Sequence, residues 1–446
     1  MHALPKRETF KLGLTMFALF FGAGNIVFPP LIGQESGTNV WITIVGFLIT
    51  GVGLPFLGVL AISMSGNQLQ DLAGKVHPLF GTIFTMIVYL AIGPFFGLPR
   101  TATVSFEIGA SPFISETYLA PSLAIFSIVF FAITAWLSLR PSKITDWFGN
   151  ILTPVLLGIV AFIVIMVIIN PAGHAEAPQV PYNHTPFSSG FIEGYLTMDA
   201  IGSLVFAIII INAIKLKGIS DQKAVTKITM KAGIISVIGL CLVYVALAWI
   251  GTTSRGIAPD AVNGGLILTQ LTYHLMGPFG QILLGVAVTL ACLTTAIGLT
   301  SATAVYFSQI FTRVTYKTAV LSITAFTAII ANIGLDQLVS VTLPILVGIY
   351  PLAIVLIAGR FFDKWFKSYS EVYIFALFAA GCIGFFDMLK EFSIIINPVV
   401  QILNYLPLYE EGLGWIIPAI LFGVIGYIFA TVRRKKASTC PLQSER

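Results

Sequence analysis

The chain has 446 residues, of which 57% are hydrophobic and only 10% are charged. Its mean hydropathy is +0.94. This composition excludes a soluble globule with a polar surface and indicates a protein that crosses a lipid bilayer many times. The formal net charge of +5 does not call for a nucleic acid partner, because contact with anionic lipid headgroups accounts for basic residues beside a membrane.

Twelve stretches approach the length of about 20 mostly apolar residues that a membrane-spanning helix needs. The sequence predicts these spans, in chain order, near 10–31, 40–62, 79–100, 119–139, 148–170, 193–214, 229–251, 279–309, 318–334, 338–359, 371–389 and 414–432. The longest connection, 171–192, is polar and is predicted to form an external loop. The moderately apolar stretch 262–280 is expected to form an interfacial helix and loop at the outer mouth.

The basic residues give the expected orientation. If the N-terminus is cytoplasmic, 21 of the 24 Lys and Arg lie on the inner side, and only Arg100, Arg255 and Lys390 lie outside. Such a distribution obeys the positive-inside rule. We therefore expect a multi-pass plasma membrane protein with both termini in the cytoplasm and a basic tail over 433–446.

The first span contains an unusual stretch, FALFFGAGNIVFPP, over residues 17–30. Its residues Gly22 to Gly24 allow the backbone to leave the helix and a ligand to approach closely. The first half-helix would then end at Phe20 and Phe21, leaving carbonyls that suit a small cation. A second half starting near Asn25 would offer free N–H groups and a positive dipole end to an anion. The alternative is a seam of small residues for close helix packing.

The sixth span repeats this pattern, because LTMDAIGSLVF at 196–206 echoes LTMFALFFGAGNIVF at 14–28. A second break is therefore expected at Asp199 to Ser203. Paired interruptions in two halves of a chain indicate a transporter binding site. Since five spans separate the two segments, the halves must be inverted. The sequence predicts repeats over about 10–170 and 193–359, two added helices over 371–432, and a single transporter domain over 1–432.

Asp199 is the strongest single candidate for a functional residue in this pattern. Burying an unpaired carboxylate within a membrane span costs free energy, so such a residue is a functional candidate. It could bind a substrate ammonium or a coupling cation, or carry a proton. The alternative is that Asp199 caps the second half-helix by accepting its amide hydrogens.

The eighth span contributes hydroxyl groups through LACLTTAIGLTSATAVYF, residues 290–307. Thr294 and Thr295 follow Ala291 by three and four residues, so they share a helix face with its carbonyl. Hydroxyl and carbonyl oxygens are neutral donors that suit sodium. The alternative is that both threonines bond only to their own helix.

Four strings together carry a family resemblance: LFFGAGNIVFPP, GPFFGLPRTATVSFEIG, GYLTMDAIGSLVF and LACLTTAIGLTSATAVYF. Their order and spacing resemble the bacterial branched-chain amino acid carriers, which are cation-coupled symporters for leucine, isoleucine and valine. The resemblance covers nearly the whole chain. It implies an all-α polytopic protein with the five-plus-five inverted repeat of the leucine-transporter fold, and discontinuous first and sixth helices.

The resemblance also implies site residues, which join those expected from the two breaks. The expected substrate contacts are Gly22, Ala23, Gly24, Asn25, Asp199, Ala200 and Gly202. The expected sodium ligands are the carbonyls of Ala18, Phe21 and Ala291 with the hydroxyls of Thr294 and Thr295. Arg100 and Glu107 flank TATVSF in the second string. Arg100 could attract a carboxylate or gate the entry, or it could reach the interface or pair with Glu107.

The expected activity is uptake of leucine, isoleucine and valine, coupled to sodium by alternating access. Proton coupling and transport of another neutral amino acid are the alternatives. An ion channel would need a filter-like sequence, and a membrane-embedded enzyme would need convergent nucleophiles, metal ligands or a phosphate cradle. The sequence contains none of these patterns, so we expect a transporter and no enzyme.

Overall fold

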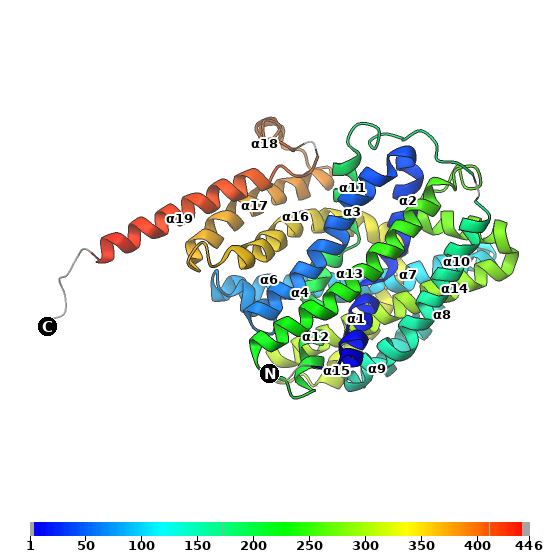
Figure 1. Ribbon diagram of the computed structural model, residues 1–446, viewed down its shortest axis with the longest axis horizontal. Helices are drawn as coiled ribbons and strands as arrows, with labels where there is room; N and C mark the ends of the chain where they lie inside the picture. Colours follow the sequence, from blue (N-terminus) through cyan, green and yellow to red (C-terminus); the bar gives the residue numbers. More distant parts are fainter. Residues whose placement is uncertain (1–3, 172, 410, 439–446) are drawn as a thin grey trace. The chain divides into compact units, whose positions relative to one another are not determined.

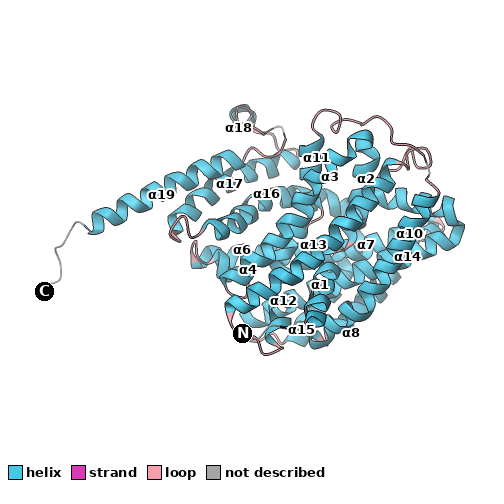
Figure 2. Ribbon diagram, viewed as in Figure 1, coloured by secondary structure: helices cyan, strands magenta, loops and turns pink. Residues whose placement is uncertain are grey.

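A computed structural model describes residues 4–171, 173–409 and 411–438. Within these residues the chain is helical and contains no strand, as Figure 2 shows. The end of the predicted basic tail, 439–446, lies outside the described residues. Two compact units are present, one formed by Met1–Gln68 with Ile87–Thr342 and the other by Leu69–Met86 with Leu343–Arg446.

The helices follow one another as labelled in Figure 1. Their bounds are α1 Lys6–Phe20, α2 Ala23–Ser36, α3 Val40–Leu48, α4 Leu54–Ser65, α5 Leu69–Ala73, α6 Pro78–Leu90, α7 Gly97–Gly109, α8 Leu119–Ser138, α9 Ile144–Trp147, α10 Thr153–Ile169, α11 Pro186–Leu196, α12 Asp199–Lys215, α13 Gln222–Thr252, α14 Gly264–Ile310, α15 Tyr316–Ile330, α16 Leu335–Phe362, α17 Ser370–Glu391, α18 Asn397–Leu403 and α19 Ile416–Ser438.

Ten helical stretches of the described chain are long and apolar enough to cross a membrane, or up to eleven if the bent pair α11 and α12 forms one span. One stretch, Ala23–Ser65, holds part of the first predicted span and the whole of the second. The protein is therefore a multi-pass membrane protein.

The interruption expected within residues 17–30 is present. Helix α1 ends at Phe20 and α2 begins at Ala23, and Gly22 between them is extended, with φ −122° and ψ −155°. The second half begins two residues before the predicted Asn25. The reason is a local cap, since the Gly22 N–H donates to Asn25 Oδ1 at 3.2 Å and closes the first turn.

The second interruption lies earlier than predicted. Helix α11 ends at Leu196 and α12 begins at Asp199, with a bend of 42°. The predicted break at Asp199 to Ser203 is wrong, because those residues are helical. Met198 turns the chain in the left-handed region, with φ 70°. The Thr197 hydroxyl stabilises both ends, donating to the Gly194 carbonyl at 2.8 Å and accepting the Asp199 N–H at 3.3 Å.

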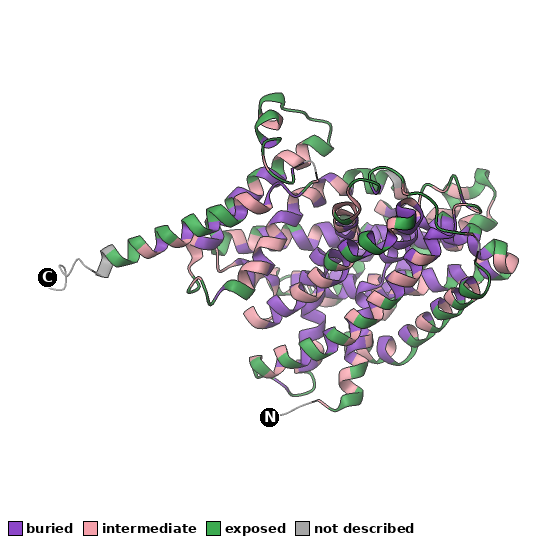
Figure 3. Ribbon diagram, turned by 45° about the horizontal axis from the view of Figure 1, so that its top comes forward, coloured by how far each residue is buried: buried purple, intermediate pink, exposed green. Residues whose placement is uncertain are grey.

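Buried aromatic rings hold the end of α1 in place. Phe20 meets Phe206 of α12 edge-on, with ring centroids 5.7 Å apart. Phe21 stacks on Tyr244 of α13 at 6.2 Å. Helix α12 is itself apolar on all sides, and 14 of its 17 residues are buried. A helix buried on every face belongs to the interior of the protein, and Figure 3 shows the concentration of buried residues there.

Two further irregularities shape the helices around this interior. A π-helical turn at Ala91–Phe95 interrupts the third span directly before α7, and Gly93 there has a non-helical ψ of −117°. Helix α14 is kinked at Gly277, with φ 62°. The segment Gly264 to Met276 is thus a helix before the long eighth span, consistent with the separate helix expected over 262–280.

Ion pairs tie the N-terminal end of α1 to two other segments. Glu8 accepts from the Lys217 ammonium, and this hydrogen bond lowers the pKa of the Glu8 carboxyl. Lys11 lies 3.5 Å from Glu8 and 3.9 Å from Asp146 of α9. The three interactions hold the start of α1 against the loop after α12 and against α9.

We expect Glu8→Gln to loosen this end of α1. Exposed ion pairs contribute up to about 1 kcal/mol, so amide hydrogen exchange over residues 6–20 should rise roughly two- to fivefold. Exchange measured by mass spectrometry checks this. Glu176→Gln, which removes the ion pair with Arg255, is the control and should leave exchange over 6–20 unchanged. Equal exchange in the Glu8 variant and the parent protein would show that these ion pairs do not stabilise the start of α1.

Candidate functional site

The two breaks meet at one small buried cavity of about 40 Å³. A side chain on Gly24 would come within 3.1 Å of the Thr197 Cα, so the backbones of the two breaks are in close contact. Six of the seven predicted substrate contacts line the cavity, and Ala200 is the exception, buried elsewhere on α12. The lining residues include Gly22, Ala23, Gly24, Asn25, Ile92, Arg100, Thr197, Met198, Asp199, Gly202, Phe206, Thr295 and Leu299.

The Asn25 side chain connects three helices at this cavity. Its amide nitrogen donates to the Asp199 carboxylate of α12 and to the Tyr244 hydroxyl of α13, while its oxygen accepts the Gly22 N–H. The sequence predicted that backbone N–H groups near Asn25 bind the substrate. In the structure it is the Asn25 side chain that forms hydrogen bonds at the cavity. Sequence reasoning missed Tyr244, because one tyrosine in an apolar span gives no local signal.

Asp199 occupies the first position of α12 and is buried. The N-cap of that helix is Met198, and no side-chain cap bond is present. The capping alternative for Asp199 is therefore wrong. Its carboxylate instead accepts from Asn25 and faces the cavity, where it can accept from a bound ammonium group.

Arg100 is the second charged residue at the cavity, and sequence analysis had not placed it there. Its guanidinium donates at 2.9 Å to the Leu196 carbonyl, which lies at the end of α11, where carbonyls lack helical partners. The guanidinium carbon lies 5.1 Å from the centroid of the Phe28 ring. The positive charge of Arg100 attracts the negatively charged Asp199 carboxylate. The Gly-Pro interruption before α7 was the sequence feature that could have indicated that Arg100 lies at this cavity. Glu107, two turns further along α7, lines a different cavity.

Four of the five predicted cation ligands come together beside the first break. The Thr294 hydroxyl lies 3.0 Å from the Ala18 carbonyl and 2.8 Å from the Ala291 carbonyl. The Thr295 hydroxyl lies 3.5 Å from the Ala18 carbonyl and 3.2 Å from the Leu19 carbonyl, which was not predicted. This set of neutral oxygens is the type that a monovalent cation can use.

Phe21, the fifth predicted ligand, is the first residue after α1. Its N–H donates to the Phe17 carbonyl at 2.7 Å. The carbonyl groups of the last turn of α1 have no helical partners further along the chain, because the helix ends here. The break therefore presents carbonyls that threonine hydroxyls can reach at one end, and the first N–H groups of α2 at the other.

Solved structures of other transporters share this architecture. Mhp1, a nucleobase-cation-symport-1 family transporter, aligns with a TM-score of 0.62 over 98% of this chain and 94% of its own, at 16% identity. MhsT in complex with L-phenylalanine aligns with a TM-score of 0.56 over 96% and 99% of the two chains, at 15% identity. Both are transporters of the leucine-transporter fold, and these likenesses establish the fold.

Sequence relatives identify the family. The branched-chain amino acid transport protein family model matches residues 5–433. Branched-chain amino acid permease BraB of Bacillus subtilis is 46% identical over 428 residues, covering 96% of each chain. Branched-chain amino acid permease BrnQ of Escherichia coli is 39% identical over 432 residues, covering 96% of this chain and 97% of its own. The chain therefore belongs to the branched-chain amino acid transport protein family, and it is a transporter and not an enzyme.

Proposed function

We propose that this protein imports leucine, isoleucine and valine across the plasma membrane, coupled to sodium, by alternating access. The observation that carries the proposal is the meeting of two broken helices at a buried cavity. One break offers free N–H groups and the other a carboxylate, so the two charged ends of an amino acid find complementary partners. The names of the relatives support branched-chain amino acids as the substrates.

The substrate carboxylate is proposed to bind the N–H groups at the start of α2, at Ala23 and Gly24. The ammonium binds Asp199 across the cavity. The lining also includes the apolar side chains of Ile92, Phe206 and Leu299. Arg100 and Asp199 are the only ionisable residues among the described residues of the lining. An apolar pocket discriminates one methylene by only about 1 to 3 kcal/mol, so the three branched-chain amino acids should share one route.

The size of the cavity supports a mechanism with large conformational changes. At about 40 Å³ it has room for about three water molecules, and an amino acid of leucine's size does not fit. Opening on either side requires α2 and α12 to move relative to their neighbours. A cation beside the first break drives transport only if it binds the open and closed states with different affinity.

We further propose the arrangement expected from the sequence for the whole chain. It comprises twelve spans in a single transporter domain over 1–432, inverted repeats over 10–170 and 193–359, two added helices and cytoplasmic termini. In this arrangement each sodium ion entering down a potential of 100 mV contributes about 2.3 kcal/mol to uphill uptake.

A proton-coupled transporter is the second candidate, and Asp199 is the observation that favours it. A buried carboxylate beside the substrate cavity can take up and release a proton as the cavity opens to each side. Sodium coupling relies instead on the oxygens of Ala18, Ala291, Thr294 and Thr295, which are neutral at every physiological pH.

Uptake of labelled leucine into proteoliposomes tests the proposal. A sodium gradient, a proton gradient and a membrane potential are imposed separately. Accumulation driven by sodium at equal pH supports the proposal, and accumulation driven only by protons selects the second candidate. Absence of saturable uptake of leucine, isoleucine and valine under all three conditions would contradict both.

The first break also yields a prediction for Gly22. A Cβ atom there would lie 2.6 Å from Thr295 Oγ1, so Gly22→Ala must push the break away from α14. We expect leucine uptake to fall about tenfold or more, because shifts of about 1 Å in a positioned site carry costs of this size. Gly158→Ala is the control, since no atom would lie within 4 Å of its Cβ, and it should retain full uptake. Unchanged uptake by Gly22→Ala would contradict the close packing.

A further inference from the structure

A second and much larger cavity lies at the far end of α7. It measures about 500 Å³ and is walled by the end of α7, the start of α8, the first turns of α14 and the connection before α16. This volume falls in the range of small-molecule sites, about 300 to 1,000 Å³. Helices α7 and α14 contribute residues to both this cavity and the central one, but the two cavities share no lining residue.

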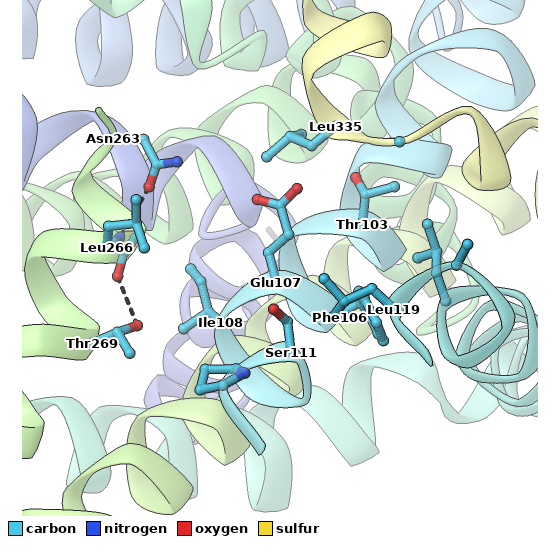
Figure 4. A pocket seen from close by; sticks show the side chains of 15 residues that line it. Thr103, Phe106, Glu107, Ile108, Ser111, Leu119, Asn263, Leu266, Thr269 and Leu335 are labelled. Atoms are coloured by element: carbon cyan, nitrogen blue, oxygen red, sulfur yellow. Dashed lines mark hydrogen bonds between the residues drawn. The ribbon is translucent and has the colours of Figure 1, made fainter. Parts of the chain in front are cut away.

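The lining of this outer cavity is mostly apolar with a single ionisable group. Its apolar wall includes Phe106, Leu119, Leu123 and Leu266. Among the lining residues that the structure describes, Glu107 is the only acidic or basic one, and Figure 4 shows its carboxylate directed into the space between α14 and Leu335. A carboxylate at the wall favours a bound cation over a bound anion.

Uncharged polar side chains also line the cavity. Figure 4 shows Thr103 and Asn263 on either side of the Glu107 carboxylate, with Ser111 near the backbone of Glu107. The Asn263 side chain accepts the Leu266 N–H at 2.9 Å and fixes the first turn of α14. An ammonium group donates three hydrogen bonds, so one carboxylate with nearby hydroxyl and amide oxygens can satisfy it.

The wall formed by α14 is in close contact with the helix that follows the first break. A Cβ on Gly264 would lie 1.9 Å from the Val27 carbonyl of α2, and one on Gly265 would lie 2.8 Å from Ile108 of α7. The start of α14 is thus closely packed between α2 and α7. A ligand that holds this turn in place also restrains the movement of α2.

We propose that the outer cavity is a second ligand site, which binds a primary ammonium group carrying an apolar body of about the size of leucine's side chain. Glu107 pairs with the ammonium, and the apolar body packs against Phe106, Leu119 and Leu266. With the N-terminus cytoplasmic, the site faces the external side. A bound ligand slows leucine uptake without occupying the central cavity.

The Glu107 carboxylate should make the outer cavity bind amines more tightly than amino acids. An amino acid would bring its carboxylate near Glu107, and the described residues that line the cavity include no lysine or arginine to bind it. We therefore expect isopentylamine, which has the leucine side chain and an ammonium but no carboxylate, to bind more tightly than leucine. A phosphatidylethanolamine headgroup is a second source of the same ammonium.

Isothermal titration of isopentylamine into the full-length protein tests the site, in phosphatidylcholine nanodiscs and in nanodiscs that also contain phosphatidylethanolamine. Glu107→Gln should weaken amine binding about tenfold or more, since charge-assisted bonds are lost. Leu123→Trp, which fills the cavity, should also abolish it. Glu116→Gln is the matched control, an exposed acid nearby in the chain that does not line the cavity.

Leucine uptake is measured for each variant in parallel and shows whether the protein is folded and active. Amine binding that is weakened about tenfold or more in Glu107→Gln and lost in Leu123→Trp supports the site. Weaker binding of the amine in the presence of phosphatidylethanolamine identifies the lipid as a competing source and supports the same ammonium site. Equal binding by the parent protein and Glu107→Gln, or no binding in phosphatidylcholine, overturns it. None of these outcomes depends on whether sodium or protons drive uptake.

Discussion

Asp199→Asn is expected to lower leucine uptake roughly 100-fold at neutral pH. The substitution keeps the shape of the side chain and removes its charge, so the substrate ammonium would be buried without an anionic partner. Removing one member of a buried charge pair costs about 2 to 5 kcal/mol, and each 1.4 kcal/mol corresponds to a factor of ten. Initial rates of labelled leucine uptake in proteoliposomes, at matched protein content, measure the effect.

Leucine counterflow distinguishes the two roles proposed for Asp199. Exchange of labelled for unlabelled leucine needs substrate binding but no net movement of protons. If Asp199 binds the ammonium, the asparagine variant loses exchange as well as uptake. If exchange persists while uptake is lost, Asp199 carries a proton. Asp260→Asn, a change in the exposed loop before α14, is the control and should retain both activities. Full uptake by Asp199→Asn would remove the residue from the site.

The double variant Thr294→Ala and Thr295→Ala is expected to raise the sodium concentration for half-maximal uptake about tenfold or more. Both hydroxyls lie within hydrogen-bonding distance of carbonyls at the end of α1, and sodium would share these oxygens. Loss of two of five ligands weakens cation binding, whereas the leucine contacts remain. Leucine KM at saturating sodium should therefore change less than the sodium dependence.

Two further variants separate a cation site from simple helix packing. Replacing both threonines with serine keeps the hydroxyl oxygens and should largely restore sodium dependence. Thr300→Ala removes a buried hydroxyl elsewhere on α14 and should leave the sodium dependence unchanged. A double alanine variant that is active and shows the parent's sodium dependence would exclude these threonines as ligands.

The positions of the breaks show how far local sequence can be interpreted. The first break was predicted from Gly22 and Gly24, and the backbone does leave the helix at Phe21 and Gly22. The second break was placed two residues too late, because Gly202 gave the stronger local signal. Met198 makes that turn instead, in a left-handed conformation that residues other than glycine seldom adopt and that depends on its packed surroundings.

The sequence by itself determined the membrane class, the presence of two interruptions, six of the fifteen residues that line the central cavity and the threonines beside α1. These follow from composition, helical spacing and paired motifs, which are properties of the local chain. Only the tertiary structure decided that Asn25 joins Asp199 to Tyr244, that Arg100 holds the end of α11, and that Glu107 lines a separate cavity. Each of these depends on contacts between residues from different helices, and no pattern along one helix specifies which side chains will meet.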